Sequence, residues 1–338
     1  MKILAGIIAS LGVLLTTAPP TQAADLIPIK IGVVQTLAVG PIFVADERGY
    51  FRDEGLDANI VFFDAAQPIS VAAASGDVDF GCTGMAAAFY SLAGQGVLKI
   101  IAGGNREMPG FKNAAYIASN RAYNAGFTSL KQLAGKTVAV TQFGSQLHYD
   151  LGLAAEKYKI PLKDIHIAAL QTNTNVSSAL AGGQADLAVF PVTPTMALLS
   201  RNDAHLVGWV GDEVPFDQAN TAFTSTKIAD GKHDTVERFL RAFKRGAKEY
   251  HDAFADDQEH RRDGPTAQAI IAILAKYTKQ KVDTIDTAIP WLDAQLRLDA
   301  KDVRHQIEWF TEQGQMKGKV NPADVIDKRY VVPLPGRE

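Results

Sequence analysis

The residues best able to do chemistry in this sequence are glycines, hydroxyls and amides that follow short apolar runs. Gly144-Ser145 and Thr83-Gly84 are the clearest cases, because each stands directly before a run with helical periodicity. The first turn of a helix has free N–H groups and a partial positive charge, so these turns can bind a carboxylate, sulfonate or phosphate. Ser145 can equally serve only as the N-cap of its own helix, a role worth about 1 kcal/mol.

Arg106 is the one cation in the loops of this kind. Its guanidinium offers a planar fork that matches a carboxylate or sulfonate, and the alternative is an ion pair with Glu107 or another acid. Aromatic residues near the same loops could form an apolar wall for an organic ligand, or could belong to the core. They are Phe43, Tyr116, Phe143, Phe190 and Phe223.

Signatures of catalysis are missing from the same regions. The run from Phe143 to Leu147 lacks the second glycine of a nucleophile elbow, and no complete dinucleotide-binding or Walker-type glycine motif occurs. The segment 251–260 has the composition of a metal cluster, but Arg261 and Arg262 could pair with its acids, which favours a solvated helix end. The sequence therefore predicts a binder with no cofactor and no metal, not an enzyme.

The amino-acid composition restricts the classes of partner that the protein can bind. The chain has 338 residues, 47% of them hydrophobic and 21% charged, with a net charge of -3. Such a balance has no basic excess that could neutralise nucleic acid, and the length suits about two domains. The single cysteine, Cys82, excludes an intrachain disulfide and is expected in the core.

Strand-length apolar runs alternate with helical patterns, which is typical of βαβ units and a largely parallel sheet. The expected strands are 29–34, 58–63, 78–81, 99–102, 137–141, 165–169 and 187–190. The expected helices are 44–54, 69–75, 85–92, 146–159 and 176–181, followed by a helical tail at 234–254, 266–278 and 300–314.

An internal repeat divides the chain. At a constant offset of 107 positions, Ile31 aligns with Val138 and Ile60 aligns with Ile167. Two extended segments, 114–119 and 221–226, stand at the ends of the second copy and could cross between lobes. We therefore expect a discontinuous first lobe, residues 24–114 and 222–338, and a second lobe, residues 115–221.

Ligands of open α/β sheets bind outside the carboxyl ends of the strands. In a two-lobed protein these ends face each other across a cleft. The residues that we expect to bind a ligand there are Gln35, Thr36, Gln67, Thr83, Gly84, Asn105, Arg106, Gln142, Ser145, Gln146, Asn173 and Thr193.

The first residues have the pattern of a signal peptide. Lys2 is followed by an apolar run from Ile3 to Leu15 and a small-residue region that ends at Ala23. The run is shorter than the roughly 20 residues of a spanning helix. We expect cleavage after residue 23, export to a periplasm and no stable membrane anchor.

Several sequence segments of the chain resemble segments of periplasmic solute-binding proteins of ABC importers in the nitrate/sulfonate/taurine group, which includes a thiamine-pyrimidine branch. The segments are those at 41–45, 49–51, 54–56, 74–81, 130–140, 183–189, 310–314 and 325–330. The single-turnover synthases of the pyrimidine branch carry a cysteine-rich motif that is absent here.

The resemblance implies a type II periplasmic-binding-protein fold, with two α/β lobes, two crossing strands and a cleft that closes on one ligand. It also implies a monomer that delivers its ligand to an ABC permease and its ATPase subunits. The loops favour a small organic anion, such as a sulfonate, a taurine-like compound or an aromatic carboxylate. A neutral pyrimidine or other heterocycle, and a sensor subunit of a receptor kinase, are the alternatives.

Overall fold

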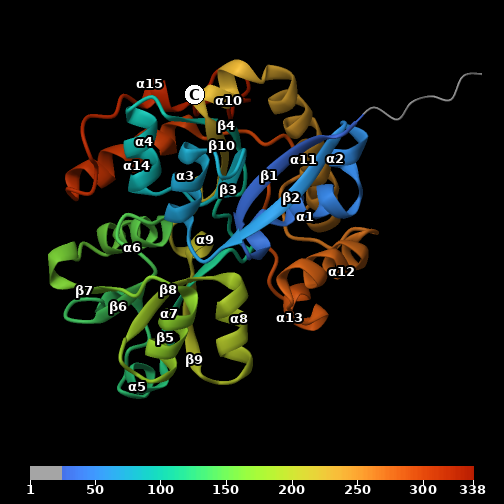
Figure 1. Ribbon diagram of the computed structural model, residues 1–338. Helices are drawn as coiled ribbons and strands as arrows, with labels where there is room; N and C mark the ends of the chain where they lie inside the picture. The colour runs from blue at the N-terminus through green and yellow to red at the C-terminus, as the bar shows by residue number, and fades with distance from the viewer. Residues whose placement is uncertain (1–24) are drawn as a thin grey trace, which may run out of the picture.

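The computed structural model describes residues 25–338. The expected signal peptide, residues 1–23, lies outside this range. The described chain forms two lobes, each with a five-stranded sheet between helices (Figure 1). No helix in residues 25–338 is both long enough and apolar enough to cross a membrane.

The first sheet has the order β2-β1-β3-β10-β4, in which β10 runs antiparallel to both of its neighbours. The second sheet has the order β7-β6-β8-β5-β9, with β5 antiparallel to β8 and β9. The first consists of β1 (Ile27–Val34), β2 (Leu56–Phe63), β3 (Phe80–Thr83), β4 (Leu98–Gly103) and β10 (Thr221–Ser225). The second consists of β5 (Ala114–Ser119), β6 (Thr137–Val140), β7 (His166–Ala169), β8 (Leu187–Pro191) and β9 (Ala204–Trp209).

The two sheets repeat one another in register as well as in order. Ile31 pairs with Ile60 in the first sheet, and Val138 pairs with Ile167 in the second. These are the positions that the 107-residue offset aligns, so the predicted repeat is confirmed. The chain crosses from the first sheet to the second between β4 and β5, and it returns between β9 and β10. The first sheet therefore contains four strands that precede the second sheet in the sequence and one strand, β10, that follows it.

Helices cover both faces of the first sheet. One face carries α1 (Gly40–Glu47), α2 (Tyr50–Asp53), α10 (Thr226–Gly231), α11 (His233–Phe254), α12 (Ala267–Thr278) and α13 (Val282–Asp286), with the short 3-10 helix η1 (Leu37–Val39). The other carries α3 (Ala66–Ser75), α4 (Ala87–Gly94), α14 (Ala300–Glu312) and α15 (Pro322–Val325). The single helix expected over 44–54 is wrong, because Gly49 adopts a φ of 73° that separates α1 from α2.

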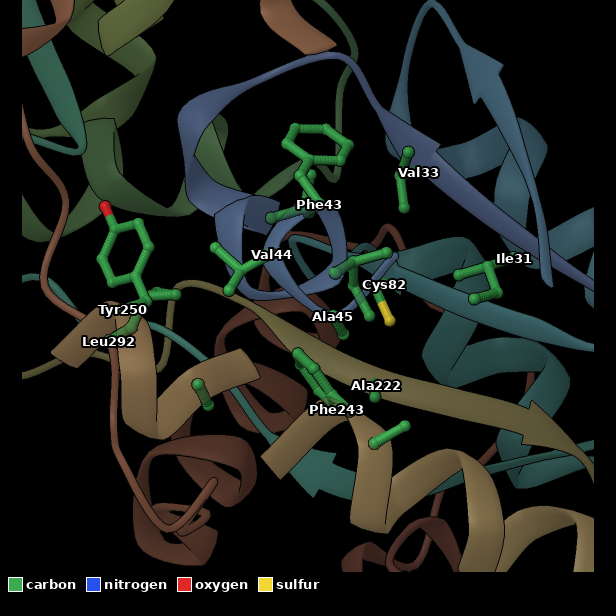
Figure 2. Close-up of a cluster of buried hydrophobic side chains, with 14 of the residues drawn as sticks. Ile31, Val33, Phe43, Val44, Ala45, Cys82, Ala222, Phe243, Tyr250 and Leu292 are labelled. Carbon is green, nitrogen blue, oxygen red and sulfur yellow. The ribbon is translucent and has the colours of Figure 1, made fainter. Parts of the chain in front are cut away.

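The largest apolar cluster lies between β1, α1 and α11 (Figure 2). Val33, Phe43 and Phe243 are among its buried members. Cys82 lies in the same cluster and is 2% exposed, and burial raises the pKa of its thiol. The predicted core position of Cys82 is confirmed.

The second lobe is also layered. On one face of its sheet lie α5 (Asn120–Asn124), α6 (Gln146–Lys157) and α9 (Val210–Glu213), and on the other lie α7 (Asn173–Ala181) and α8 (Val192–Ser200). Two 3-10 helices, η2 (Leu130–Gln132) and η3 (Leu162–Asp164), complete it. Helix α14 of the tail packs against α6, so the tail supports both lobes (Figure 1).

Candidate functional site

A cavity of about 720 Å³, its open mouth included, lies between the lobes. It is bounded by the loops at the carboxyl ends of the parallel strands and by both crossing segments. From the first lobe come Val34, Thr36, Ala38, Val39, Asp64, Ala65, Ala66, Thr83 and Gly84. From the second lobe come Thr141, Ser145, Gln146, Leu147, Asp150, Asn173 and Pro191. Asn105, Asn113, Ala114, Ala219 and Asn220 come from the crossings and the strand ends beside them.

The structure brings many of the predicted site residues together at this cavity. Ser145 has both of the roles considered from the sequence, since it lines the cavity and its Oγ accepts from the His148 N–H as the N-cap of α6. The predicted residues that line the cavity are Thr36, Thr83, Gly84, Asn105, Ser145, Gln146 and Asn173.

Other predicted residues lie outside the lining. Gln35 Nε2 donates to the Tyr277 carbonyl at 2.7 Å, on the side of α12. Gln67 is exposed on α3, and Gln142 is half-buried in the loop after β6. Thr193 Oγ1 accepts from the Leu37 N–H at 3.3 Å, which joins α8 of the second lobe to the first lobe.

Arg106 is turned away from the cavity lining. It is 8% exposed, and its guanidinium lies 4.5 Å from the centre of the Trp291 ring. Its Nη2 lies 3.9 Å from Asp293 Oδ2. Arg106 therefore contacts the C-terminal tail of the chain. It does not pair with Glu107, and it does not line the cavity.

The expected set did not include several lining residues, among them Asn113, Asp150 and Asn220. Asn113 and Asn220 come just before strands β5 and β10. Because these two strands are antiparallel to the rest, their amino ends lie at the same sheet edge as the carboxyl ends of the others. Asp150 lies one helical turn after Gln146, so this spacing alone could have placed it on the same face of α6.

The amide of Gln146 is fixed by two carboxyl groups, one on the lining residue Asp150 and one on Asp217 behind the lining. Its Nε2 donates to Asp150 Oδ1 at 3.0 Å and to Asp217 Oδ2 at 2.9 Å. Both amide hydrogens are thereby used, which leaves Oε1 as the free end. Gln146 Oε1 and Asp150 Oδ2 are buried and have no partner in the described part of the chain.

A second set of amides reaches the cavity from the first crossing. Asn105 Nδ2 donates to Asn113 Oδ1 at 2.7 Å, and Asn113 Nδ2 donates to Glu107 Oε1. The remaining oxygen of Asn105, Oδ1, is buried without a protein partner, and so is Asn173 Oδ1. Three residues of the cavity lining, Asn105, Gln146 and Asn173, thus each have a buried amide oxygen that lacks a hydrogen-bond donor.

The carboxyl groups near the cavity affect one another's pKa. Burial raises the pKa of Asp150 well above its ordinary value, and the charge of Glu107 raises it further. The pKa of Asp217 is likewise raised by burial and by Asp150. Among the described residues, no Lys, Arg or His side chain lines the cavity to offset these acids.

Within residues 25–338, no three His, Cys, Asp or Glu side chains are grouped so that they could hold a metal ion. The segment 251–260 that resembled a metal cluster has a different structure. His251 Nε2 lies 2.8 Å from Glu259 Oε2, and the same oxygen accepts from Trp291 Nε1 at 2.7 Å.

Residues 37–256 match the family model described as NMT1/THI5 like. The match covers more than half of the chain, so the protein belongs to the NMT1/THI5-like family. A Brucella abortus (strain 2308) protein, whose name calls it a binding protein, is 30% identical over 176 residues. That alignment covers 52% of this chain and 51% of the relative, so it spans about half of each protein.

Solved structures share the fold at low sequence identity. The alkanesulfonate-binding protein SsuA from Xanthomonas axonopodis pv. citri, bound to MOPS, has a TM-score of 0.71 and 18% identity, covering 90% of this chain and 99% of SsuA. The desulfurization enzyme DSZB has a TM-score of 0.60 and 12% identity, covering 90% and 96%. The chain therefore has the two-lobed type II periplasmic-binding-protein fold, as expected, and this fold is found in both a binding protein and an enzyme.

Proposed function

We propose that this protein is the periplasmic substrate-binding component of an ABC importer and that its ligand is a small neutral molecule rich in N–H groups. An amino-substituted pyrimidine or a similar heterocycle fits this description. Of the two ligand classes raised by the sequence, an organic anion and a neutral heterocycle, the proposal takes the second. The observation that carries it is the set of buried, unpartnered oxygens of Asn105, Gln146 and Asn173.

Hydrogen-bond energetics favour a ligand that donates. A buried acceptor without a partner costs about 1–3 kcal/mol, which a ligand N–H recovers. A sulfonate, a taurine-like compound or an aromatic carboxylate would instead place its own negative oxygens against these acceptors and beside Asp150. The starts of α6 and α7 supply only partial positive charge, and the cavity lining provides no cationic side chain as a counterion.

Capture by closure is supported by contacts between the lobes. The Ala87 N–H donates to the Gly144 carbonyl at 2.8 Å, and the Leu37 N–H donates to Thr193 Oγ1 at 3.3 Å. A ligand that touches both lobes gains its full contacts only when they are closed, so it shifts the population toward the closed form. Family membership and the names of the relatives support export to the periplasm, delivery to a permease with its ATPase, and a role in binding without turnover.

The test is a binding screen of the chain from residue 24 onward. The panel contains 4-aminopyrimidine, taurine, ethanesulfonate, benzoate and nitrate, with thermal shift, calorimetry and mass spectrometry as readouts. We expect 4-aminopyrimidine to bind one to one, to raise the melting temperature and to be recovered unchanged. Binding of the anions alone would overturn the ligand class, and conversion of a compound would overturn the binding role.

Two variants show whether the cavity is the binding site. Asn105→Ala removes a lining acceptor, and we expect it to weaken 4-aminopyrimidine binding about tenfold. Gln67→Ala changes an exposed residue of α3 outside the lining and is the matched control. Equal affinities for the two variants would place the ligand elsewhere.

A further inference from the structure

The second crossing passes from one lobe to the other over a very short stretch of chain. Val214 packs on the apolar cluster of the second lobe. Gln218 is already held by helix α14 of the first lobe, because its N–H donates to Asp302 Oδ2 at 2.7 Å. The change of lobe therefore takes place within residues 215–217, and Phe216 is in the middle of this stretch.

The first crossing changes lobe at the same level of the structure. Glu107 lies between β4 of the first lobe and Gly110, whose N–H donates to Asp212 Oδ1 of the second lobe at 3.1 Å. The two crossings are paired at this point. The Phe216 N–H donates to the Glu107 carbonyl at 2.6 Å, and the Glu107 N–H donates to the Asp217 carbonyl at 3.1 Å. A hinge between the lobes has its axis where the two crossings meet.

The backbone of Phe216 is strained at this axis. Its φ is 75°, in the left-handed region, where the Cβ of an L-residue comes too close to the following carbonyl oxygen. Lys159, Asn202 and Lys279 also have a positive φ, but each lies within two residues of the end of a helix, where a left-handed residue commonly ends the helix. Burial of the ring does not hold Phe216 in place either, since the residue is 48% exposed.

We propose that Phe216 is a strained hinge residue that opposes closure of the lobes and thereby limits the affinity for the ligand. The inference rests on the proposed function for closure around a ligand. When the lobes separate, the dihedral angles at the hinge change and Phe216 relaxes to an ordinary φ. The free protein therefore stays mainly open and admits a ligand, and the contacts of the ligand with both lobes offset the strain on closure.

The test compares a variant that removes the strain with one that removes only the ring. Phe216→Gly has no Cβ, and we expect it to bind 4-aminopyrimidine about tenfold more tightly than wild type in calorimetry. Its radius of gyration without ligand, measured by small-angle X-ray scattering, should be smaller than that of wild type. Phe216→Ala keeps the Cβ, so it should show at most a small part of both changes. Lys159→Gly introduces a glycine at an exposed left-handed position outside the hinge and is the matched control.

The outcomes separate the hinge from the proposed function. Unchanged affinity and radius in Phe216→Gly, or equal gains in Phe216→Gly and Phe216→Ala, would overturn the role of Phe216 and leave the proposed function in place. A wild type that does not bind 4-aminopyrimidine would overturn the ligand class, and the radii of the free variants would then decide the hinge inference. If Phe216→Gly does not fold, Phe216→Asn should give smaller changes in the same direction, because asparagine adopts the left-handed region more readily.

Discussion

The two lobes build the same sheet, with strands in the same order and register, yet they give the cavity different chemistry. Apart from Asp64, the first lobe contributes small, aliphatic or hydroxyl side chains, such as Thr36, Ala65 and Gly84. The second lobe contributes longer polar groups, including Gln146 and Asp150. The difference suggests that the second lobe and the crossings recognise the ligand and that the first lobe closes over it.

The tail of the chain accounts for part of this asymmetry. Helix α6, which carries Gln146 and Asp150, is supported from behind by α14. Tyr149 Oη donates to Asp302 Oδ1 at 3.1 Å, and the Trp309 ring packs on the helix at Gly152. Gln146 and Asp150 form the recognition wall of the cavity, and the helix that carries them is therefore held in place by residues about 150 positions later in the chain.

The largest expected effect comes from breaking this support. A Cβ at position 152 would lie 2.2 Å from Trp309 Cζ2, so Gly152→Ala must displace α14 or α6. We expect a loss of about 3 kcal/mol in the free energy of unfolding and a parallel loss of ligand affinity. Urea unfolding and calorimetry measure the two. Gly231→Ala is the matched control, because a Cβ there meets no atom within 4 Å; equal stabilities of the two variants would contradict the prediction.

The next effect concerns the recognition wall itself. Gln146→Leu removes a buried, unpartnered acceptor from a residue of the lining and leaves Asp150 and Asp217 without their shared amide donor. We expect the free energy of unfolding to fall by about 2 kcal/mol and affinity for 4-aminopyrimidine to fall at least tenfold. Gln142→Leu, at a half-buried position outside the lining, is the control. A binding loss that is equal in both variants would remove Gln146 from the site.

Much of the fold could be predicted because the apolar periodicity of each element and the internal repeat can both be read directly from the sequence. The strands around Ile31 and Ile60 show in their apolar runs, and the offset of 107 carries their pairing to Val138 and Ile167. Strand β9 and helix α8 were not predicted. Strand β9 contains His205 and has few buried positions, so its sequence lacks the apolar run of a central strand.

The site was predictable only to the level of loops. The rule that ligands bind at the carboxyl ends of strands places Thr83 and Gln146 at the cavity. It does not give the direction of a side chain, which depends on partners far away in sequence. Arg106 shows this most clearly, because Trp291 and Asp293 of the tail hold it away from the lining.

A smaller, pH-dependent effect tests the charge of the recognition wall. Burial and the charge of Glu107 raise the pKa of Asp150 in the folded protein above its unfolded value. The folded state then binds the proton more tightly than the unfolded state does. The wild-type protein therefore loses stability as the pH rises from the unfolded-state pKa of Asp150 toward its folded-state pKa. Asp150→Asn is neutral throughout, and its free energy of unfolding relative to wild type should increase between pH 5 and pH 8.

Urea unfolding at several pH values measures this difference. Asp64→Asn, at an exposed position of the same cavity, is the control variant. A difference between Asp150→Asn and wild type that stays constant with pH would show that Asp150 does not carry a raised pKa.

The smallest expected effect lies in the first lobe, and it tests whether the second lobe and the crossings alone recognise the ligand. Thr83 lines the cavity and is 4% exposed. Thr83→Val keeps its shape, so we expect affinity for 4-aminopyrimidine to change less than about threefold. Asn173→Leu, which removes an unpartnered acceptor from the second lobe, should weaken binding about tenfold. If Thr83→Val causes the larger loss, the first lobe takes part in recognition and does more than close the cavity.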